Sequence, residues 1–194
     1  MKDELLYKNI PRYMADFFLF CKECLGYKDM NKKHEQLCTF LQFDKHSSLL
    51  VLMPRYTFKS WIITQGYSLW SLVRNPNLRI LIYSDSSTKS TTFLQGIKNH
   101  IEGKLGGSQF KDYFGIWYSN SGPNAKDALK WNTEQIVVSK RTNAAVEPSV
   151  DTSGIDSSKV GMHYDLIIFD DIVSDANATT RLQMDKVYDC YKRA

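Results

Sequence analysis

Two short stretches of this chain combine residue types that can handle a phosphate group. The first is an apolar run at residues 49–53 followed by the loop Pro54-Arg55-Tyr56-Thr57-Phe58-Lys59-Ser60. This order resembles a phosphate-binding loop, G-x-x-x-x-G-K-[ST], which a strand precedes and a helix follows. Met53 and Phe58 stand where that pattern has its two glycines. On spacing alone, an ordinary strand-to-helix turn explains the stretch equally well.

The second stretch is an apolar run at residues 166–169 that leads directly into Asp170 and Asp171. Protein-bound Mg²⁺ usually takes one or two protein oxygen ligands and fills its remaining positions with water and substrate phosphates. In phosphate-loop enzymes these ligands are the Ser or Thr after the lysine and an acid that follows a strand. Ser60 and Asp170 are therefore the predicted Mg²⁺ ligands. Taken alone, the two acids are explained equally well as a solvated strand end.

Together the two stretches predict a site for ATP and Mg²⁺. Both follow predicted parallel strands, and ligands of open α/β sheets bind at the carboxyl ends of such strands. Lys59 would hold the β- and γ-phosphates, and the backbone N–H groups of loop 54–60 would bind the remaining phosphate oxygens. Asp171 would orient or deprotonate the attacking water. Arg55 would reach the γ-phosphate as an arginine finger, or else form a salt bridge at the sheet edge.

The elements that position these residues follow from apolar periodicity and turn residues. Helices are expected at residues 8–25, 31–43 and 61–73, from about 87 to 101, and at 110–114 and 178–191. Strands are expected at residues 49–53, 79–83, 134–138, 145–150 and 166–169, and loops at 119–126 and over most of 141–158. Strands that alternate with helices predict an α/β fold with a mainly parallel central sheet flanked by helices. We expect an N-terminal helical segment at 1–44 and a core at 45–194.

Composition sets broad limits on the class of protein. The chain has 194 residues, of which 43% are hydrophobic and 24% are charged, and its formal net charge is +4. These values are typical of a globular domain, and the mild basic excess permits contact with nucleic acid. The sequence contains no apolar run long enough to span a bilayer, and its N-terminus is not that of a signal peptide. We therefore expect a soluble intracellular protein with no membrane partner.

Three cysteines and one histidine have spacings that imitate a zinc site, namely Cys21, Cys24, His34 and Cys38. Cys21 and Cys24 fit the helical periodicity of the first predicted helix, and neither Gly nor Pro lies between them to make the turn of a zinc knuckle. We therefore expect the cysteines to be small buried hydrophobic residues. His34 and Gln36 are expected to be exposed on the second predicted helix.

Several stretches resemble the large terminase subunits of tailed bacteriophages. In that family an Arg precedes the loop lysine, as Arg55 does in Pro54-Arg55-x-x-x-Lys59-Ser60, and the glycines are often incomplete. Residues 79–101 (RILIYSDSSTKSTTFLQGIKNHI) resemble the strand and helix that follow that loop. Residues 147–155 and 161–171 resemble the approach to the second nucleotide motif, LIIFDD. The resemblance covers roughly residues 31–180.

The resemblance implies a P-loop NTPase fold of the RecA/ASCE type and an ATPase that pumps double-stranded viral DNA into a procapsid. It implies contacts to DNA phosphates, a portal protein and a small terminase subunit as partners, and a homo-oligomeric ring acting in the host cell cytoplasm. It also implies an endonuclease domain in the full-length protein, beyond the end of this sequence. By the same resemblance, His34 and Gln36 are candidates for adenine contact. Lys159 is a candidate for insertion into a neighbouring subunit's site, with a solvated loop lysine as its alternative.

Two other functions remain open. A helicase-like or RecA-related ATPase would share Lys59, Ser60, Asp170 and Asp171. A non-hydrolysing nucleotide-fold module that serves as a docking piece would explain the missing glycines. The substitution at Phe58 is the larger departure from the pattern. If that position needs a positive φ, a phenylalanine there is strained.

Overall fold

The computed structural model describes residues 10–118, 129–157, 159, 161–175 and 177–193. The loop expected at 119–126 and the first residues of segment 1–44 lie outside this part. The chain forms two compact units, one of Met1–Arg74 with Ile97–Trp117 and one of Asn75–Gly96 with Tyr118–Ala194. This division differs from the expected boundary after residue 44. The reason is that Trp70 belongs to the helical unit, where its indole N–H donates to the Tyr13 carbonyl at 3.0 Å.

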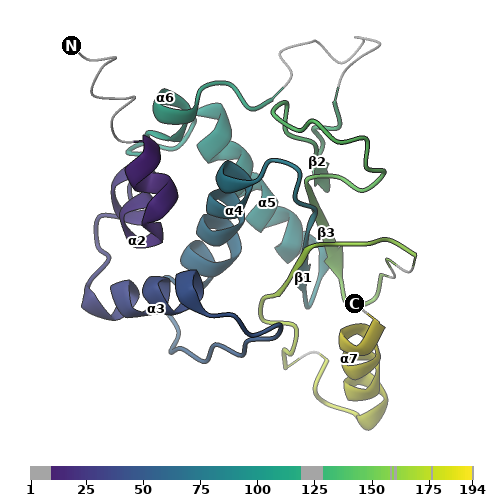
Figure 1. Cartoon of the computed structure of the whole chain (residues 1–194). Helices are drawn as coiled ribbons and strands as arrows, with labels where there is room; N and C mark the ends of the chain where they lie inside the picture. Colours follow the sequence, from purple (N-terminus) through teal and green to yellow (C-terminus); the bar gives the residue numbers. More distant parts are fainter. Residues whose placement is uncertain (1–9, 119–128, 158, 160, 176, 194) are drawn as a thin grey trace, which may run out of the picture. The chain divides into compact units, whose positions relative to one another are not determined.

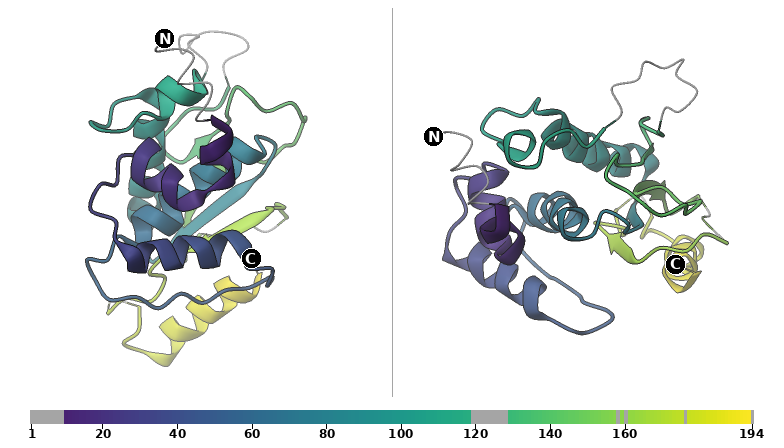
Figure 2. Two further views of the ribbon diagram at one scale, coloured as in Figure 1. Left: turned by 60° about the vertical axis from the view of Figure 1, so that its left-hand side comes forward. Right: turned by 45° about the horizontal axis from the view of Figure 1, so that its top comes forward.

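The first unit is helical. It contains a helical turn at residues 10–15, α2 (Phe17–Leu19), the π-helices η1 (Phe20–Cys24) and η2 (Trp61–Tyr67), α3 (Lys32–Phe43), α4 (Ser68–Arg74) and α6 (Phe110–Phe114). Asn31 is the N-cap of α3, as predicted, and its side chain accepts from the Lys33 N–H at 3.0 Å. The two helices α2 and α3 lie side by side (Figure 2).

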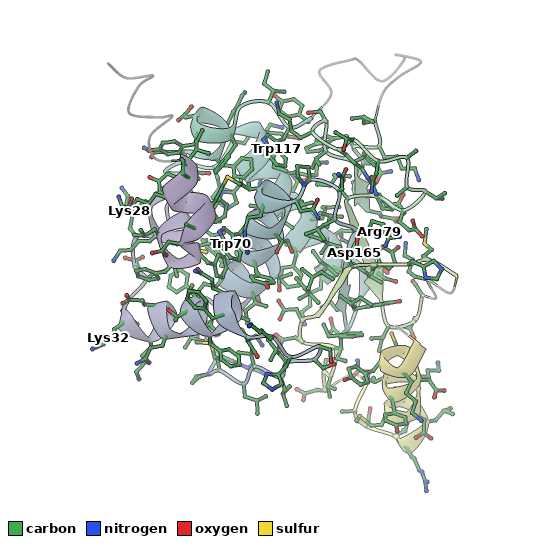
Figure 3. All side chains as sticks on the ribbon, in the orientation of Figure 1. Lys28, Lys32, Trp70, Arg79, Trp117 and Asp165 are labelled. Carbon is green, nitrogen blue, oxygen red and sulfur yellow. The ribbon has the colours of Figure 1, made fainter. Side chains whose placement is uncertain are left out.

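The core of the helical unit is rich in aromatic and cysteine side chains. Phe17 is fully buried, and its ring centroid lies 5.1 Å from that of Trp70, which is labelled in Figure 3. Cys21, Cys24 and Cys38 are free and fully buried, so they are the buried hydrophobic residues that the sequence predicts. Desolvation by burial raises the pKa of the Cys24 thiol well above its ordinary value. The Cys24 thiol is therefore a neutral packing group.

The second unit contains an open mixed sheet. Its strands are β1 (Ile80–Ser84), β2 (Gln135–Ile136), β3 (Val150–Gly154) and β4 (Leu166–Phe169), in the order β2-β3-β1-β4 (Figure 1). The central strand β1 runs parallel to β3 and β4, whereas β2 is antiparallel to β3. Helix α7 (Arg181–Arg193) packs through Cys190 against Leu81 and Tyr83 of β1. The chain is thus α/β with a mainly parallel sheet flanked by helices, as expected.

Helix α5 (Ser87–Glu102) follows β1 and crosses the division between the units after Gly96. Its start is fixed by a close approach to the end of β3. A Cβ atom added at Gly154 would lie 2.6 Å from the Ser87 backbone nitrogen. Only glycine therefore fits at the carboxyl end of β3 without a shift of one of these two backbones.

The strand predicted at residues 49–53 is wrong. These residues belong to no strand, and Leu50 and Leu52 are 84% and 82% exposed. A short apolar run is compatible both with a buried strand and with a segment outside the sheet. Such a run has no periodicity that would distinguish the two. The strand expected at 145–150 lies instead at Val150–Gly154. Pro148, which has no N–H for the ladder, lies two residues before this strand.

The amino ends of β1 and β4 are joined by an ion pair. The Arg79 guanidinium donates to Asp165 through Nη2 at 2.8 Å and Nε at 3.0 Å, and the two side chains face each other in Figure 3. The Arg79 backbone N–H also donates to Asp165, at 2.9 Å. The hydrogen bonds from Arg79 lower the pKa of Asp165. Both residues lie at the end of the strands opposite to Asp170.

Candidate functional site

Loop 54–60 is a tight turn that leads directly into a helix. The Thr57 hydroxyl donates to the Pro54 carbonyl at 2.6 Å, which closes the turn. Lys59 and Ser60 are the first helical residues, and helical backbone continues from them to Arg74. A helix N-terminus offers backbone N–H groups and a partial positive charge to an anion. The lysine and serine therefore lie at a helix N-terminus, as they do in a phosphate-binding loop, but no strand precedes the loop.

The backbone of this loop adopts the conformation that glycine favours. Tyr56 has φ 63° and Phe58 has φ 56°. A left-handed backbone costs a non-glycine residue about 1–3 kcal/mol and persists only when the surroundings hold it. The strain anticipated at Phe58 is therefore present, at the position where the phosphate-loop pattern has its second glycine. Tyr56, which the pattern does not single out, shares the conformation and is fully exposed.

Phe58 is surrounded by aromatic rings. Its ring centroid lies 5.7 Å from that of His34 and 5.8 Å from that of Trp61, at interplanar angles of 85° and 86°. His34 is only 6% exposed, so its predicted exposure is wrong. The cause is a capping box, in which His34 Nδ1 accepts from the Asn31 N–H at 2.9 Å and the imidazole turns inward. Gln36 is exposed, as predicted.

The second candidate stretch follows β4 in the sheet unit. Asp170 is 4% exposed, and its backbone N–H donates to the Tyr83 carbonyl of β1 at 2.9 Å. Asp171 is exposed and has φ 49°. In the part of the chain that the structure describes, the only non-glycine residues with positive φ are Tyr56, Phe58 and Asp171. All three lie in the two stretches that were selected from the sequence.

Asp85 is a further carboxylate at the same sheet edge, and it belongs to neither of the two stretches predicted from the sequence. Tyr83 of β1 pairs with Phe169 of β4, and Asp85 and Asp171 each lie two residues after that pair. Burial alone would raise the pKa of Asp85, but the hydrogen bond and ion pair with Lys89 at 3.2 Å, together with hydrogen bonds from Ser174 and Ser84, lower it overall. The signal for Asp85 was an acid directly after a buried strand, the same signal that identified Asp170.

Lys159 is engaged within its own unit. Its ammonium lies 3.0 Å from Asp151, a fully buried carboxylate on β3, and only 18% of its side chain is exposed. The Tyr164 hydroxyl donates to the same carboxylate at 2.6 Å. Burial, and then this hydrogen bond, raise the pKa of Tyr164. The interpretation of Lys159 as a solvated loop lysine is therefore wrong.

Arg55 is exposed within the loop, and among the described residues it forms no ion pair. The sheet-edge salt bridge that the sequence left open as its alternative role is therefore not formed there. A guanidinium held by no carboxylate keeps all its N–H donors for a phosphate.

Ser60 and Asp170 each carry oxygen atoms, the type of ligand that Mg²⁺ takes in proteins. No cluster of three or more His, Cys, Asp or Glu side chains suited to a metal occurs in the described part of the chain. A Mg²⁺ ion that takes one hydroxyl, one carboxylate and the phosphates of a nucleotide does not need such a cluster. Ser60 belongs to the helical unit and Asp170 to the sheet unit.

A separate hollow of about 540 Å³ lies in the helical unit. It is lined by Lys22, Glu23, Gly26, Lys28, Gly107, Ser108 and Gln109. None of the residues selected from the sequence lines it.

No helix in the described residues has the length and apolarity needed to cross a membrane.

No model of a known protein family matches this chain, and no curated protein sequence matches it significantly. Its function is therefore inferred from its residues and their geometry.

Proposed function

We propose that this chain is the ATPase part of a viral terminase large subunit with a P-loop NTPase fold, which hydrolyses ATP to move double-stranded DNA into a procapsid. One observation carries the proposal. The three non-glycine residues with positive φ among the described residues, Tyr56, Phe58 and Asp171, lie in the two stretches whose residue types fit a nucleotide site. Strained backbone concentrates at functional sites, because it persists only where the surrounding structure holds it.

Each residue has a role that its local setting supports. Lys59, at the start of its helix, neutralises charge on the β- and γ-phosphates. The Ser60 hydroxyl and the Asp170 carboxylate would hold Mg²⁺, which supplies charge neutralisation at the phosphate oxygens. Asp171 is exposed and orients the water that attacks the γ-phosphorus while the bond to the β-phosphate oxygen breaks. Arg55 contacts the oxygens of the transferred phosphoryl group.

The proposed partners follow from the proposed family and from charge. The net charge of +4 permits contacts to DNA phosphates, which are independent of base sequence and sensitive to salt. A portal protein, a small terminase subunit and further copies of the chain in a ring complete the proposed packaging machine. The host cytoplasm is its proposed location.

Steady-state hydrolysis of Mg-ATP, with and without double-stranded DNA, tests the proposal. We expect the wild-type chain to hydrolyse ATP and DNA to stimulate the rate. Lys59→Ala and Asp171→Asn should each lower kcat at least about 100-fold, because each removes a group that acts on the reacting phosphate or water. Arg55→Ala should lower kcat by a similar factor and change the Kd for Mg-ATP less than about threefold, because its contact strengthens in the transition state.

Lys45→Ala is the matched control, since Lys45 is exposed, lies in the same unit and follows α3 rather than the loop. Its rate should equal that of the wild-type chain. Normal rates in Lys59→Ala or Asp171→Asn would overturn the assignment. A loss of Mg-ATP binding in Arg55→Ala at unchanged kcat would instead give Arg55 a role in ground-state binding.

A non-hydrolysing docking module is the second candidate. The exposure of Leu50 and Leu52 favours it, because residues 49–53 do not form the strand that precedes a phosphate-binding loop. Such a module would bind Mg-ATP or a partner without turnover, and the wild-type chain would then show no hydrolysis at any DNA concentration. Hydrolysis that depends on Lys59 excludes this function.

A further inference from the structure

The residue at position 58 raises a structural question, because a phosphate-binding loop normally has glycine there. Phe58 holds φ 56° without the freedom that glycine has. A phenylalanine keeps such a backbone only if its side chain is held by contacts that another backbone conformation would break. The rings around Phe58 provide such contacts.

The two neighbours of Phe58 are themselves fixed. His34 is buried, and its Nδ1 accepts from the Asn31 N–H at 2.9 Å, which sets the plane of its ring at the start of α3. Because Nδ1 accepts this hydrogen bond, the proton of the neutral imidazole is on Nε2. The Phe58 ring meets this fixed plane at 85°, the edge-to-face geometry that aromatic pairs favour.

The other neighbour, Trp61, is 46% exposed and contacts the helical core through Tyr27. Its ring centroid lies 5.4 Å from that of Tyr27, which is 3% exposed. The Tyr27 hydroxyl is hydrogen-bonded to His100 Nε2 at 3.0 Å, and His100 is 1% exposed. Phe58 therefore contacts two rings, one held by the N-cap of α3 and the other packed against the buried Tyr27.

We propose that His34 and Trp61 form an aromatic clamp on Phe58, which holds loop 54–60 in its left-handed conformation and so positions the phosphate-binding backbone without glycine. Phe58, His34 and Trp61 are then positioning residues, since they act through the loop backbone. This inference rests on the proposed function for its purpose, namely phosphate binding. Its structural content, a loop held by three rings, does not depend on that function.

Limited trypsin digestion of the full chain tests the clamp without nucleotide. Trypsin cleaves after Arg55 and Lys59 inside the loop and after Lys45 outside it, so cleavage after Lys45 serves as an internal reference. A loop released from its clamp opens more often and is cut faster. We expect the ratio of loop cleavage to Lys45 cleavage to rise about fivefold in Phe58→Ala and Trp61→Ala, because local opening controls proteolysis.

Two substitutions of His34 separate the clamp from the helix cap. His34→Gln keeps an acceptor for the Asn31 N–H, as glutamine does in a capping box, and removes the ring. His34→Phe keeps a ring and removes the acceptor. The clamp predicts fast loop cleavage in His34→Gln and wild-type cleavage in His34→Phe. The reverse result would make His34 a helix cap only and would overturn the proposal.

Phe43→Ala and Phe58→Gly complete the test. Phe43 is a 68% exposed phenylalanine at the end of α3, so its loss should leave loop cleavage unchanged. Phe58→Gly relieves the backbone strain but removes the ring, and the clamp predicts fast cleavage. Wild-type cleavage in both Phe58→Gly and Phe58→Ala would overturn the clamp.

Binding of Mg-ATP, measured by calorimetry, then connects the clamp to the proposed function. We expect Phe58→Ala and His34→Gln to weaken binding about tenfold, because preorganisation of a binding loop lowers the ordering cost of the complex. In hydrolysis, KM should rise by the same factor while kcat changes less than about threefold, since Lys59 and Asp171 remain. If the variants are cut faster but the wild-type chain binds no Mg-ATP, the clamp is confirmed and the proposed function is contradicted.

Discussion

At the scale of single residues, the backbone strain at Phe58 and the aromatic contacts that offset it are of similar size. The left-handed backbone costs about 1–3 kcal/mol. An edge-to-face aromatic pair contributes about 0.5–1.5 kcal/mol beyond its burial, so the pairs with His34 and Trp61 together offset a cost of that size. Tyr56 carries the same kind of strain, but it is fully exposed and in no aromatic pair among the described residues. Phe58 is therefore the residue whose side chain determines the loop conformation.

The buried His100 makes the stability of the helical unit depend on pH. Desolvation by burial lowers its pKa from 6.5 to about 4, so the folded chain takes up this proton less readily than the unfolded chain. The stabilisation is complete above pH 6.5 and is lost as the pH falls from 6.5 towards 4. Between pH 7 and pH 5 we expect a loss of about 2 kcal/mol in the free energy of unfolding.

Urea unfolding of wild-type and His100→Gln chains at the two pH values measures this effect. The glutamine cannot be protonated, so the variant should be less stable at pH 7 and should lack this part of the pH dependence. Equal slopes in the two chains would show that His100 does not cause the loss.

At the scale of elements, the contact between the end of β3 and the start of α5 sets how closely this helix approaches the sheet. Ser87 is the first residue of α5, and its backbone nitrogen and hydroxyl face Gly154. The loop between β1 and α5 carries Asp85, whose position beside the end of β4 depends on this approach. A larger side chain at position 154 would therefore disturb both packing and the carboxyl edge of the sheet.

Gly154→Ala tests this contact. The added Cβ atom would meet the Ser87 nitrogen at 2.6 Å and its hydroxyl at 2.9 Å, so backbone must shift. We expect a loss of about 1–3 kcal/mol in the free energy of unfolding, as for other overpacked sites. Gly106→Ala is the control, because its added Cβ meets no atom within 4 Å. Circular dichroism during urea unfolding measures both variants, and equal midpoints for the two would contradict the close approach.

At the scale of the whole molecule, the chain crosses between two compact units after Arg74, within α5 after Gly96, and after Trp117. The loop with Lys59 and Ser60 belongs to one unit, and Asp170 and Asp171 belong to the other. Residues 49–53 lead into the loop outside the sheet, with Leu50 and Leu52 exposed. Because Leu50 and Leu52 are exposed, we expect them to contribute little to the free energy of unfolding.

Leu50→Ser should change the free energy of unfolding by less than about 0.5 kcal/mol, as for other exposed positions. Ile82→Ala, at a fully buried position of β1, should cost about 2–5 kcal/mol. Both variants are measured by urea unfolding under the same conditions. A cost for Leu50→Ser equal to that for Ile82→Ala would show that residues 49–53 are a buried segment.

The sequence by itself determined the elements whose signals are local. The N-cap Asn31, the acids after β4 and the break after Arg74 are chemical features of single positions, so helix α3, strand β4 and the end of α4 could be predicted. The sequence also predicts strain at position 58 if that position needs a positive φ, because the loop pattern has glycine there. These signals need no knowledge of distant residues.

Only the tertiary structure decided the rest. The ring contact of Phe58 with His34 and the close approach of Gly154 to Ser87 join residues far apart in the chain. The ion pair of Lys159 with Asp151 joins residues eight positions apart, but it depends on the burial of Asp151 in the sheet. The apolar run at 49–53 lies outside the sheet for the same reason, since strand pairing depends on the edge that another segment offers. The periodicity of a segment shows how its apolar residues are spaced, but not which other segment it packs against.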